Sequence, residues 1–465
     1  MLDIRRVLAS APKKHTEETL NSLTTVWGEA LDPSNVLPEH PRPRMQRDEY
    51  AMLNGVWKYA IAPVDGEVDV ETLAQQEIPS RWDGQIVVPF SPEAPLSGVD
   101  RTVRPHELLW YRHKIDLPKL ADEQRFILHF DAVDWMCACF VNDKLVGTHT
   151  GGYLPFSFDV TDLLGSAAAG ESATTGKVAD PSTADAGEVA PAAKSATTAE
   201  LVLCVWDPSD TGSQLRGKQR LSRGDIWYTA QSGIWQSVWY EVVSAVHLES
   251  LTLKGDMFGT LEVKANVQVS GLEGVQTGAF KLELALKDEL GQDILLATLP
   301  VDEAGEISAE QHVDDPLLWS PESPHLYAVE VTLWQDGAVV DFVRSYCAFR
   351  TVEVKPDEAG APRVHLNGAT YFVRGALDQG YWPDGLMTTP SDDALVYDIE
   401  AMKSAGFNTL RKHIKIESER WYYHCDRLGM LVWQDCVSGG SAYSPWHTSQ
   451  KPTLFSFTWN RFDDT

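Results

Sequence analysis

The chain has 465 residues, a length that corresponds to about three domains of ordinary size. It carries 67 Asp and Glu against 39 Lys and Arg, so its formal charge is −28. A surface of that sign repels polyanions, and we therefore expect no nucleic acid partner. No apolar run approaches the ~20 residues that span a bilayer, so we expect no membrane partner either. The six cysteines form no C-x-x-C motif, which predicts reduced thiols and a cytoplasmic location.

The first half of the chain predicts an arm followed by a β-sandwich. Residues 1–40 show no sustained hydrophobic period and are predicted to form an N-terminal arm. From Asn54 onward, short alternating runs follow one another with turn residues between them. Such a series predicts a jelly roll over residues 41–245, with strands at Trp110–Leu117, Arg125–Phe130, Met136–Val141, Lys144–His149, Phe156–Val160, Leu201–Trp206 and Trp235–Val243.

One segment interrupts this series. Residues 165–200 contain 12 Ala and 9 Ser or Thr and lack aromatic residues, Leu and Ile. Because such a segment cannot bury enough apolar surface to offset its ordering entropy, we predict a disordered insertion. An Ala-rich helix is the alternative, and the glycines and prolines within the segment oppose it.

A second β unit is expected over residues 246–352. Its length and its many short strands are typical of an immunoglobulin-like sandwich. The predicted strands are His247–Leu253, Leu261–Val269, Phe280–Lys287, Leu326–Trp334 and Ala338–Arg344.

The periodicity changes after residue 352. Tyr371–Arg374, Phe407–Arg411 and Met430–Gln434 are predicted strands, and helices are expected between them, from Ser391 to Gly406 and over Ser418–Leu428. This β-α-β-α-β order fits either a Rossmann-type sheet or a (β/α)8 barrel. No G-x-G-x-x-G motif follows any of the strands, which weakens the nucleotide-binding alternative.

Polar residues follow the predicted strands where a barrel places its chemistry: Asp378, Arg411, His413 and Asp435. A closed (β/α)8 barrel needs about 250 residues, whereas 114 residues remain after Thr351. We therefore predict that residues 353–465 form the beginning of a TIM barrel, which is incomplete in this chain.

Several segments resemble glycoside hydrolase family 2, which includes β-galactosidases, β-glucuronidases and β-mannosidases. Arg216-Gly-Lys-Gln219, Ile226-Trp-Tyr-Thr229 and Ser232-Gly-Ile-Trp-Gln236 are similar to its sugar-binding domain. Leu318-Trp-Ser-Pro321 resembles its immunoglobulin-like domain, and Gly406-Phe-Asn408, Arg411 and Asp426-Arg427-Leu-Gly429 resemble the opening of its barrel.

The resemblance implies a retaining β-glycosidase that uses two glutamates, an acid/base and a nucleophile. In the family the acid follows an Asn near the fourth barrel strand, and this chain has no Asn-Glu pair. We therefore expect both catalytic glutamates beyond Thr465 and the 465-residue chain to be inactive by itself. The alternatives are a non-catalytic carbohydrate-binding protein of the same domains and a structural remnant without a ligand.

The resemblance also implies substrate-binding residues and a carbohydrate as partner. We expect the substrate to contact Asp378, Trp382, Arg411, His413, Asp435 and Asp225. Some relatives bind magnesium after the third strand, but Gln434-Asp435-Cys436-Val437 supplies one carboxylate, so we assign no metal site and expect no cofactor. The glycone and the oligomeric state, including a homo-oligomer, are left open.

Overall fold

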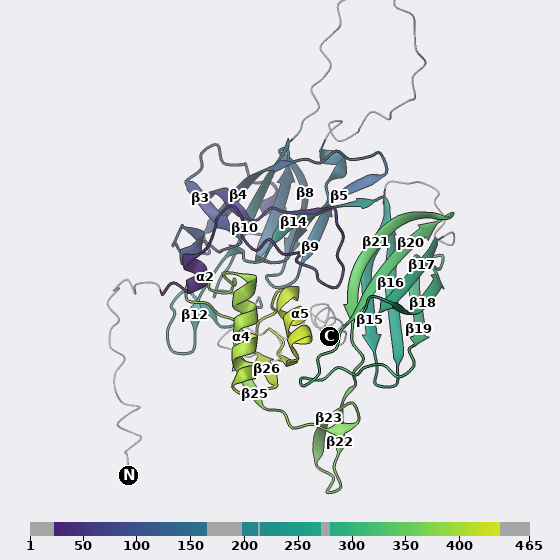
Figure 1. The fold of residues 1–465 in the computed structure, drawn as a ribbon. Coiled ribbons are helices and arrows are strands. Elements are labelled where there is room, and N and C mark those ends of the chain that lie inside the picture. Colours follow the sequence, from purple (N-terminus) through teal and green to yellow (C-terminus); the bar gives the residue numbers. More distant parts are fainter. Residues whose placement is uncertain (1–22, 165–197, 213, 271–279, 438–465) are drawn as a thin grey trace, which may run out of the picture.

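The computed structural model describes residues 23–164, 198–212, 214–270 and 280–437 (Figure 1). Most of the predicted insertion, much of the predicted arm and the last 28 residues lie outside these ranges. Thr198 and Ala199 already pair with Asp116 and Ile115, so the predicted insertion boundary at residue 200 is three residues late. No helix in the described ranges is long and apolar enough to cross a membrane.

The first body is a two-sheet antiparallel sandwich. Its six-stranded sheet has the order β3(Gly84–Val88)-β2(Gly55–Pro63)-β4(Glu107–Asp116)-β10(Thr198–Trp206)-β7(Met136–Val141)-β8(Lys144–Thr150). The four-stranded sheet has the order β1(Tyr50–Met52)-β14(Val238–Ser244)-β5(Gln124–Phe130)-β9(Phe156–Asp159). The smaller elements are α2(Val26–Glu29), α3(Val70–Ala74), η1(Pro95–Ser97), η2(Thr161–Leu163), β6(Val133–Asp134), β11(Gln219–Arg220), β12(Tyr228–Thr229) and β13(Gly233–Ile234).

Alternating side chains build the core of this sandwich. Phe126, Leu128 and Phe130 of β5 are fully buried, as are Leu201 and Leu203 of β10 in the facing sheet. Period-two burial is what two packed sheets require, because successive strand residues point to opposite faces.

The second body is a smaller antiparallel sandwich of two sheets. One sheet has the order β15(Val246–Gly255)-β16(Thr260–Val269)-β19(Glu306–His312), and the other has the order β18(Asp293–Pro300)-β17(Phe280–Lys287)-β20(Tyr327–Gln335)-β21(Ala338–Cys347). Figure 1 shows it beside the first body, with the α/β segment below and between them. The chain is mainly β, as the sequence predicts.

The α/β segment begins with a small antiparallel sheet of β22(Val352–Pro356), β23(Pro362–Leu366) and β24(Ala369–Thr370). A parallel sheet β25(Gly375–Asp378)-β26(Thr409–Lys412)-β27(Leu431–Gln434) follows, with α4(Asp392–Ser404) and α5(Glu419–Leu428) in the two connections. The predicted first strand, Tyr371–Arg374, is wrong. Arg374 instead exchanges hydrogen bonds with Asn408 just ahead of the sheet, and Gly375 is the first residue in parallel register, with Thr409.

The two faces of the parallel sheet differ. Leu410 is buried in one cluster with side chains of α4 and α5. On the opposite face Leu377, Arg411 and Trp433 stand in register on the three strands, and Leu377 and Trp433 are 51% and 60% exposed. Three parallel strands with one open face are what the described residues show, and they do not form a closed barrel.

A buried arginine joins the two sandwiches. Arg47 Nη1 donates to Glu241 Oε2 on β14 at 2.9 Å, and its Nε and Nη2 donate to the Asp341 carboxylate on β21 at 2.9 and 2.8 Å. Nη2 also donates to the carbonyl of Leu248 at 2.6 Å. All three charged side chains are at most 5% exposed, so this guanidinium fixes β14 of one sandwich against β21 of the other.

We predict that Arg47→Met lowers the free energy of unfolding by about 3 to 5 kcal/mol, because it leaves Asp341 buried without its cation and Glu241 with only the more distant Arg42 and His129. Arg344→Met is the matched control: Arg344 pairs with the largely exposed Asp48 and should cost less than about 1 kcal/mol. Urea unfolding measures both variants, and equal losses for the two would contradict the role given to Arg47.

Candidate functional site

The ends of the parallel strands meet a loop of the first sandwich. We call residues 216–229 the roof loop, since they lie over the segments that follow β25 and β26. Tyr228 stacks on Tyr381 with ring centroids 4.1 Å apart, and Tyr381 Oη donates to the carbonyl of Thr229 at 2.7 Å. Lys218 Nζ donates to Gln379 Oε1 at 2.9 Å. The candidate site is therefore a junction between two bodies that lie far apart in the sequence.

An apolar cluster lies beneath this junction. Trp235 and Tyr153 of the sandwich pack with residues that follow the three strands, namely Met387, Ile416 and Val437. A small cavity of about 20 Å³ remains between the roof loop and the strand ends, with Lys218, Gln379 and His413 in its lining. A larger cavity of about 290 Å³ lies between the second sandwich and α5, and Ile416 and Glu417 of the loop after β26 form part of its lining.

Three of the predicted residues come together at the rim. Arg411 makes a two-point contact with Asp435, Nε to Oδ1 and Nη2 to Oδ2, both at 3.0 Å. His413 Nδ1 lies 2.8 Å from Asp435 Oδ2. Partial burial opposes ionisation of Asp435, but its hydrogen bonds with Arg411 and His413 prevail and lower its pKa. The group is thus a charged carboxylate held by two side chains and open to solvent on the Arg411 side, which is 53% exposed.

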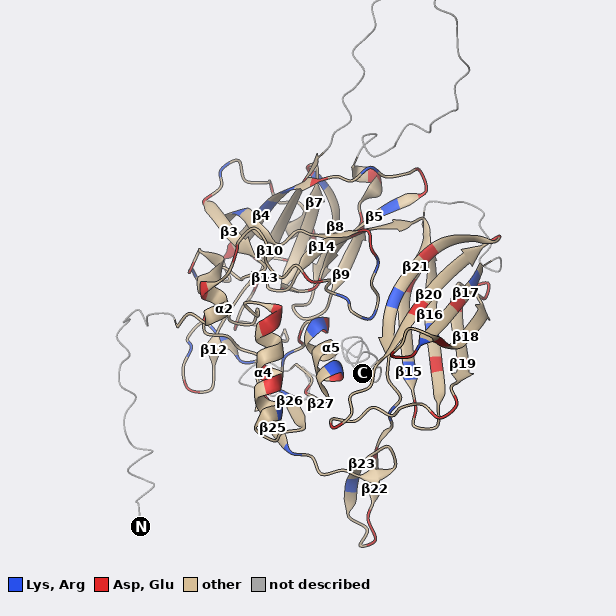
Figure 2. Ribbon diagram, in the orientation of Figure 1, with Lys and Arg blue, Asp and Glu red and all other residues tan. Residues whose placement is uncertain are grey.

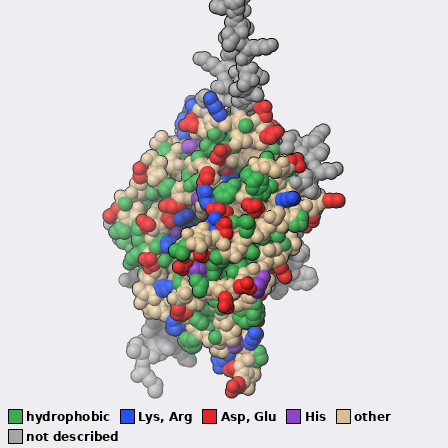
Figure 3. Space-filling view, turned by 45° about the vertical axis from the view of Figure 1, so that its right-hand side comes forward, with side chains coloured by type: hydrophobic (Ala, Val, Ile, Leu, Met, Phe, Trp, Pro, Cys, Tyr) green, Lys and Arg blue, Asp and Glu red, His purple; other side chains and the backbone are tan. Residues whose placement is uncertain are grey.

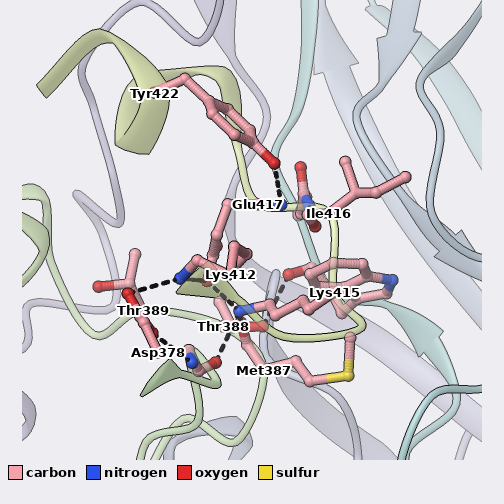
Figure 4. Close-up of polar contacts among 12 residues, drawn as sticks. Asp378, Met387, Thr388, Thr389, Lys412, Lys415, Ile416, Glu417 and Tyr422 are labelled. Carbon is pink, nitrogen blue, oxygen red and sulfur yellow. Dashed lines mark hydrogen bonds and ion pairs between the residues drawn. The ribbon is translucent and has the colours of Figure 1, made fainter. Parts of the chain in front are cut away.

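A second, buried charge cluster lies below the rim (Figure 4). Lys412 Nζ lies 3.0 Å from Asp378 Oδ2 and 3.2 Å from Glu417 Oε1. Lys415 Nζ also contacts Glu417 Oε1, and donates to the carbonyls of Gly380 at 2.6 Å and Met387 at 2.8 Å. One ammonium therefore joins the loops that follow β25 and β26.

Burial and charge act differently on the two lysines. For Lys412, burial disfavours the charged form, yet Asp378 and Glu417 outweigh it and raise the pKa. Burial lowers the pKa of Lys415, which Glu417 opposes. Both ammonium groups lie over indole rings, Lys412 Nζ 3.9 Å from the Trp421 centroid and Lys415 Nζ 5.6 Å from that of Trp235. The cluster is satisfied internally and its chemistry is that of a structural anchor.

The remaining predicted residues fall in other places. Asp378 is tied to Lys412 and accepts a hydrogen bond from the Gly380 amide at 2.8 Å, so it faces the buried cluster. Against burial, Lys412 lowers its pKa. The expectation that Trp382 stacks on a sugar needs correction, because its ring is 8% exposed and packs edge-on against Trp27 at 6.0 Å. Asp225 lies exposed at the tip of the roof loop, and no recorded contact joins it to the rim.

Sequence reasoning missed Lys412, Lys415 and Glu417. For Lys415 and Glu417 the signal was the alternation His413-Ile-Lys-Ile-Glu417 directly after a strand, in which every second residue is polar. In the described residues no three His, Cys, Asp or Glu side chains gather in an arrangement that could hold a metal ion. The expectation that the chain needs no metal stays a prediction.

Three buried carboxyl groups of the first sandwich bind the roof loop or Ser232, which follows it. Gln219 Nε2 donates to Asp134 Oδ2 at 3.1 Å, and Ser232 Oγ donates to Asp207 Oδ2 at 2.7 Å. Glu93 accepts hydrogen bonds from the amides of Val103 at 2.9 Å and Ser232 at 3.1 Å. Burial raises the pKa of Glu93 to about 8 and that of Asp207 to about 6, and it raises the pKa of Asp134 well above its usual range. Glu93 therefore retains its proton at neutral pH.

This cluster predicts a pH-dependent stability. The folded chain holds a proton on Glu93 up to about pH 8, whereas the unfolded chain releases it near pH 4.5. The stabilisation that comes from this protonated Glu93 is complete below pH 4.5 and is lost as the pH rises to about 8. We expect the free energy of unfolding to fall by about 2 to 3 kcal/mol between pH 6 and 8.

Urea unfolding across this range measures the slope for the wild type, Glu93→Gln and the exposed control Glu77→Gln. Glu93→Gln also loses an acceptor for a backbone amide, so the slope and not the absolute stability is the readout. A slope that Glu93→Gln leaves unchanged would remove Glu93 as its source.

The comparisons agree with this architecture. The family model described as the sugar binding domain of glycosyl hydrolases family 2 matches residues 50–186, and a second model of the same family matches residues 246–350. A putative β-glucuronidase of Formosa agariphila is 24% identical over 350 residues, which cover 74% of this chain and 37% of that protein. A β-galactosidase of Thermoanaerobacter pseudethanolicus is 22% identical, over 70% of this chain and 39% of its own length.

Solved structures show the same fold. The Bacteroides uniformis β-glucuronidase matches with a TM-score of 0.59 at 24% identity, over 85% of this chain and 42% of that one. The Bifidobacterium dentium β-glucuronidase complexed with coumarin-3-O-glucuronide matches with a TM-score of 0.62 at 18% identity, over 85% of this chain and 62% of that one. The fold they share with this chain has two sandwiches followed by a parallel α/β segment. The chain belongs to glycosyl hydrolases family 2, and it spans less than two fifths of the two curated relatives named above.

Proposed function

We propose that the chain provides the substrate-facing half of a retaining β-glycosidase that cleaves O-glycosyl bonds. The observation that carries this proposal is the Arg411–Asp435–His413 group at the ends of parallel strands, under the roof loop of the sugar-binding sandwich. A carboxylate held in this way can accept hydrogen bonds from sugar hydroxyls, and the exposed edge of Arg411 can donate to another oxygen of the substrate. The names of the relatives, β-glucuronidase and β-galactosidase, support the reaction class.

We further propose that β25, β26 and β27 are the first strands of a TIM barrel. All-parallel sheets occur almost only with both faces covered, because crossovers put helices on one side and a core on the other. Here α4 and α5 cover one face, and Leu377, Arg411 and Trp433 stand open on the other. Continued strands would close this face into the interior of a barrel, with Arg411 at its rim.

The proposal places the catalytic glutamates outside the 465 residues of this chain. A retaining pair needs two carboxyl groups about 5 to 5.5 Å apart on either side of the glycosidic oxygen. Glu417 is the glutamate that follows β26 most closely, and it is buried and bound to two lysines. It therefore supports the loops and neither protonates nor attacks a sugar. In this arrangement Arg411, His413 and Asp435 bind and orient the glycone.

The relatives are named as hydrolases, so we do not propose the non-catalytic carbohydrate-binding alternative. The glycone stays open among a galactoside, a glucuronide and a mannoside, and the relatives are named for the first two. All six cysteines are free thiols, which supports the proposed cytoplasmic location. A homo-oligomeric state stays open, and the expectation that the chain needs no magnesium stays a prediction.

The purified 465-residue chain should not hydrolyse aryl β-galactosides or aryl β-glucuronides, because it lacks the carboxyl pair. It should bind the matching monosaccharide, galactose or glucuronate, in calorimetry. Asp435→Asn should weaken this binding about tenfold, because it removes a charged acceptor. The exposed control Lys58→Gln should leave the affinity unchanged.

Two results would count against the proposal. Hydrolysis that is lost in Asp435→Asn or Asp378→Asn would overturn the placement of the catalytic pair outside the chain. Absence of binding by galactose, glucuronate and mannose alike would overturn the glycone role of the rim.

A further inference from the structure

The roof loop has a charge opposite to that of the whole chain. Between residues 216 and 225 it carries Arg216, Lys218, Arg220 and Arg223 against one acid, Asp225, in a protein with a formal charge of −28. Elsewhere, acidic and basic residues are interspersed over both sandwiches (Figure 2). Hydrophobic side chains lie among them on the face that Figure 3 shows. Arg216 is buried and donates to the carbonyls of Thr211 and Gly212, so it belongs to the interior of the loop.

The three other cations are held in place by neutral groups. Lys218 donates to the side-chain amide of Gln379 at 2.9 Å. The guanidinium of Arg220 lies 3.9 Å from the centroid of the Trp227 ring, and Arg223 Nη1 donates to Thr229 Oγ1 at 3.1 Å. None of the three has a carboxylate within ion-pair distance among the described residues. Arg411 at the rim differs, because both of its hydrogen bonds go to the carboxylate of Asp435.

This arrangement orients positive charge without neutralising it. A ligand that meets cations already fixed in position loses less side-chain entropy on binding than one that must order them. The stacked indole and the amide partner keep the guanidinium and the ammonium in place, and the hydrogen-bonding capacity that they leave unused is available to an anion. Lys218 and Arg220 are half-buried and Arg223 is exposed, so all three can be reached from solvent.

The position of the loop connects it to the rim. Lys218 binds Gln379, which comes directly after β25, and Tyr228 stacks on Tyr381 of the same segment. The loop around β12 lies beside α4 at the edge of the α/β segment in Figure 1. A saccharide that enters the rim with one residue therefore passes the roof loop with the residues that follow.

We propose that Lys218, Arg220 and Arg223 form a binding surface for an acidic stretch of the substrate glycan, that is, for sugar units that carry carboxylate or sulfate groups. The inference rests on the proposed glycosidase function and concerns the part of the substrate outside the glycone. Guanidinium and ammonium groups form charge-assisted hydrogen bonds with both kinds of anion. A chain of this net charge repels an acidic glycan elsewhere, so the local cations decide where such a substrate can approach.

The test is calorimetric titration of the full 465-residue chain with three oligosaccharides of equal length: one uronate-containing, one sulfated and one neutral. We expect at least one acidic oligosaccharide to bind about tenfold more tightly than the neutral one at low salt, with an affinity that falls as salt rises. The two acidic arms distinguish carboxylate from sulfate recognition.

Variants locate the binding surface. The double variant Arg220→Gln/Arg223→Gln and the single variant Lys218→Gln should each weaken binding of the acidic oligosaccharide about tenfold or more. Lys281→Gln, which removes an exposed charge of the second sandwich, should have no effect. Arg220→Lys keeps the charge and should retain most of the affinity, and thermal unfolding confirms that each variant is folded.

Equal affinity for the acidic and neutral oligosaccharides would overturn the proposal, as would an unchanged affinity of the folded double variant. Binding of poly-glutamate as tight as that of the acidic oligosaccharide would show that charge alone is recognised, and would also overturn it. These outcomes leave the glycosidase proposal untouched, since that proposal is judged by monosaccharide binding at Asp435 and by the hydrolysis assay.

Discussion

The site depends on one buried cation. Lys415 contacts Glu417 and donates to the carbonyls of Gly380 and Met387, beneath the indole of Trp235. A buried ammonium is tolerated only when acceptors surround it, so each of these contacts requires the others. These contacts fix the loop after β25 against the loop after β26. The first sandwich then packs against the surface that the two loops form together. The geometry of the rim follows from this constraint.

The charges at the junction divide into two layers with different roles. The lower layer consists of the buried Lys412, Lys415 and Glu417 and the half-buried Asp378, which neutralise one another. The upper layer consists of Asp435 with Arg411 and His413, which keep contact with solvent. Since the groups of the lower layer already bind one another, the proposed substrate contacts lie in the upper one. The roof loop adds a third group, in which cations are oriented by neutral partners and retain their charge.

The sequence predicted those elements that depend on interactions between residues close together in the chain. Strand alternation and turn residues act locally, and they placed β5, β7, β8 and β10 as well as both helices of the α/β segment. The strands β18 and β19 were missed, since their alternation is mixed with exposed Leu296 and several polar residues.

Tertiary contacts decided what the sequence could not. The first parallel strand begins at Gly375 and not at Tyr371, because the Asn408 side chain captures the Arg374 amide ahead of the sheet. Trp382 lies in the core, because α2 brings Trp27 against it from the N-terminal end of the chain. Arg411, His413 and Asp435 were predicted together, since parallel strands bring their ends to one edge. The buried lysines were missed, because burial depends on contacts with Asp378, Gly380 and Met387 in another part of the chain as well as with the nearby Glu417.

The most direct test of this account is a double-mutant cycle between Lys415 and Glu417, measured by urea unfolding of the wild type, Lys415→Met, Glu417→Gln and the double variant. The account predicts that each single variant is destabilised and that the double variant is less destabilised than the sum, with a coupling energy of about 1 to 3 kcal/mol. A coupling energy within error of zero would contradict it, because Glu417 would then not hold the Lys415 ammonium where it reaches the carbonyls of Gly380 and Met387 in the loop after β25.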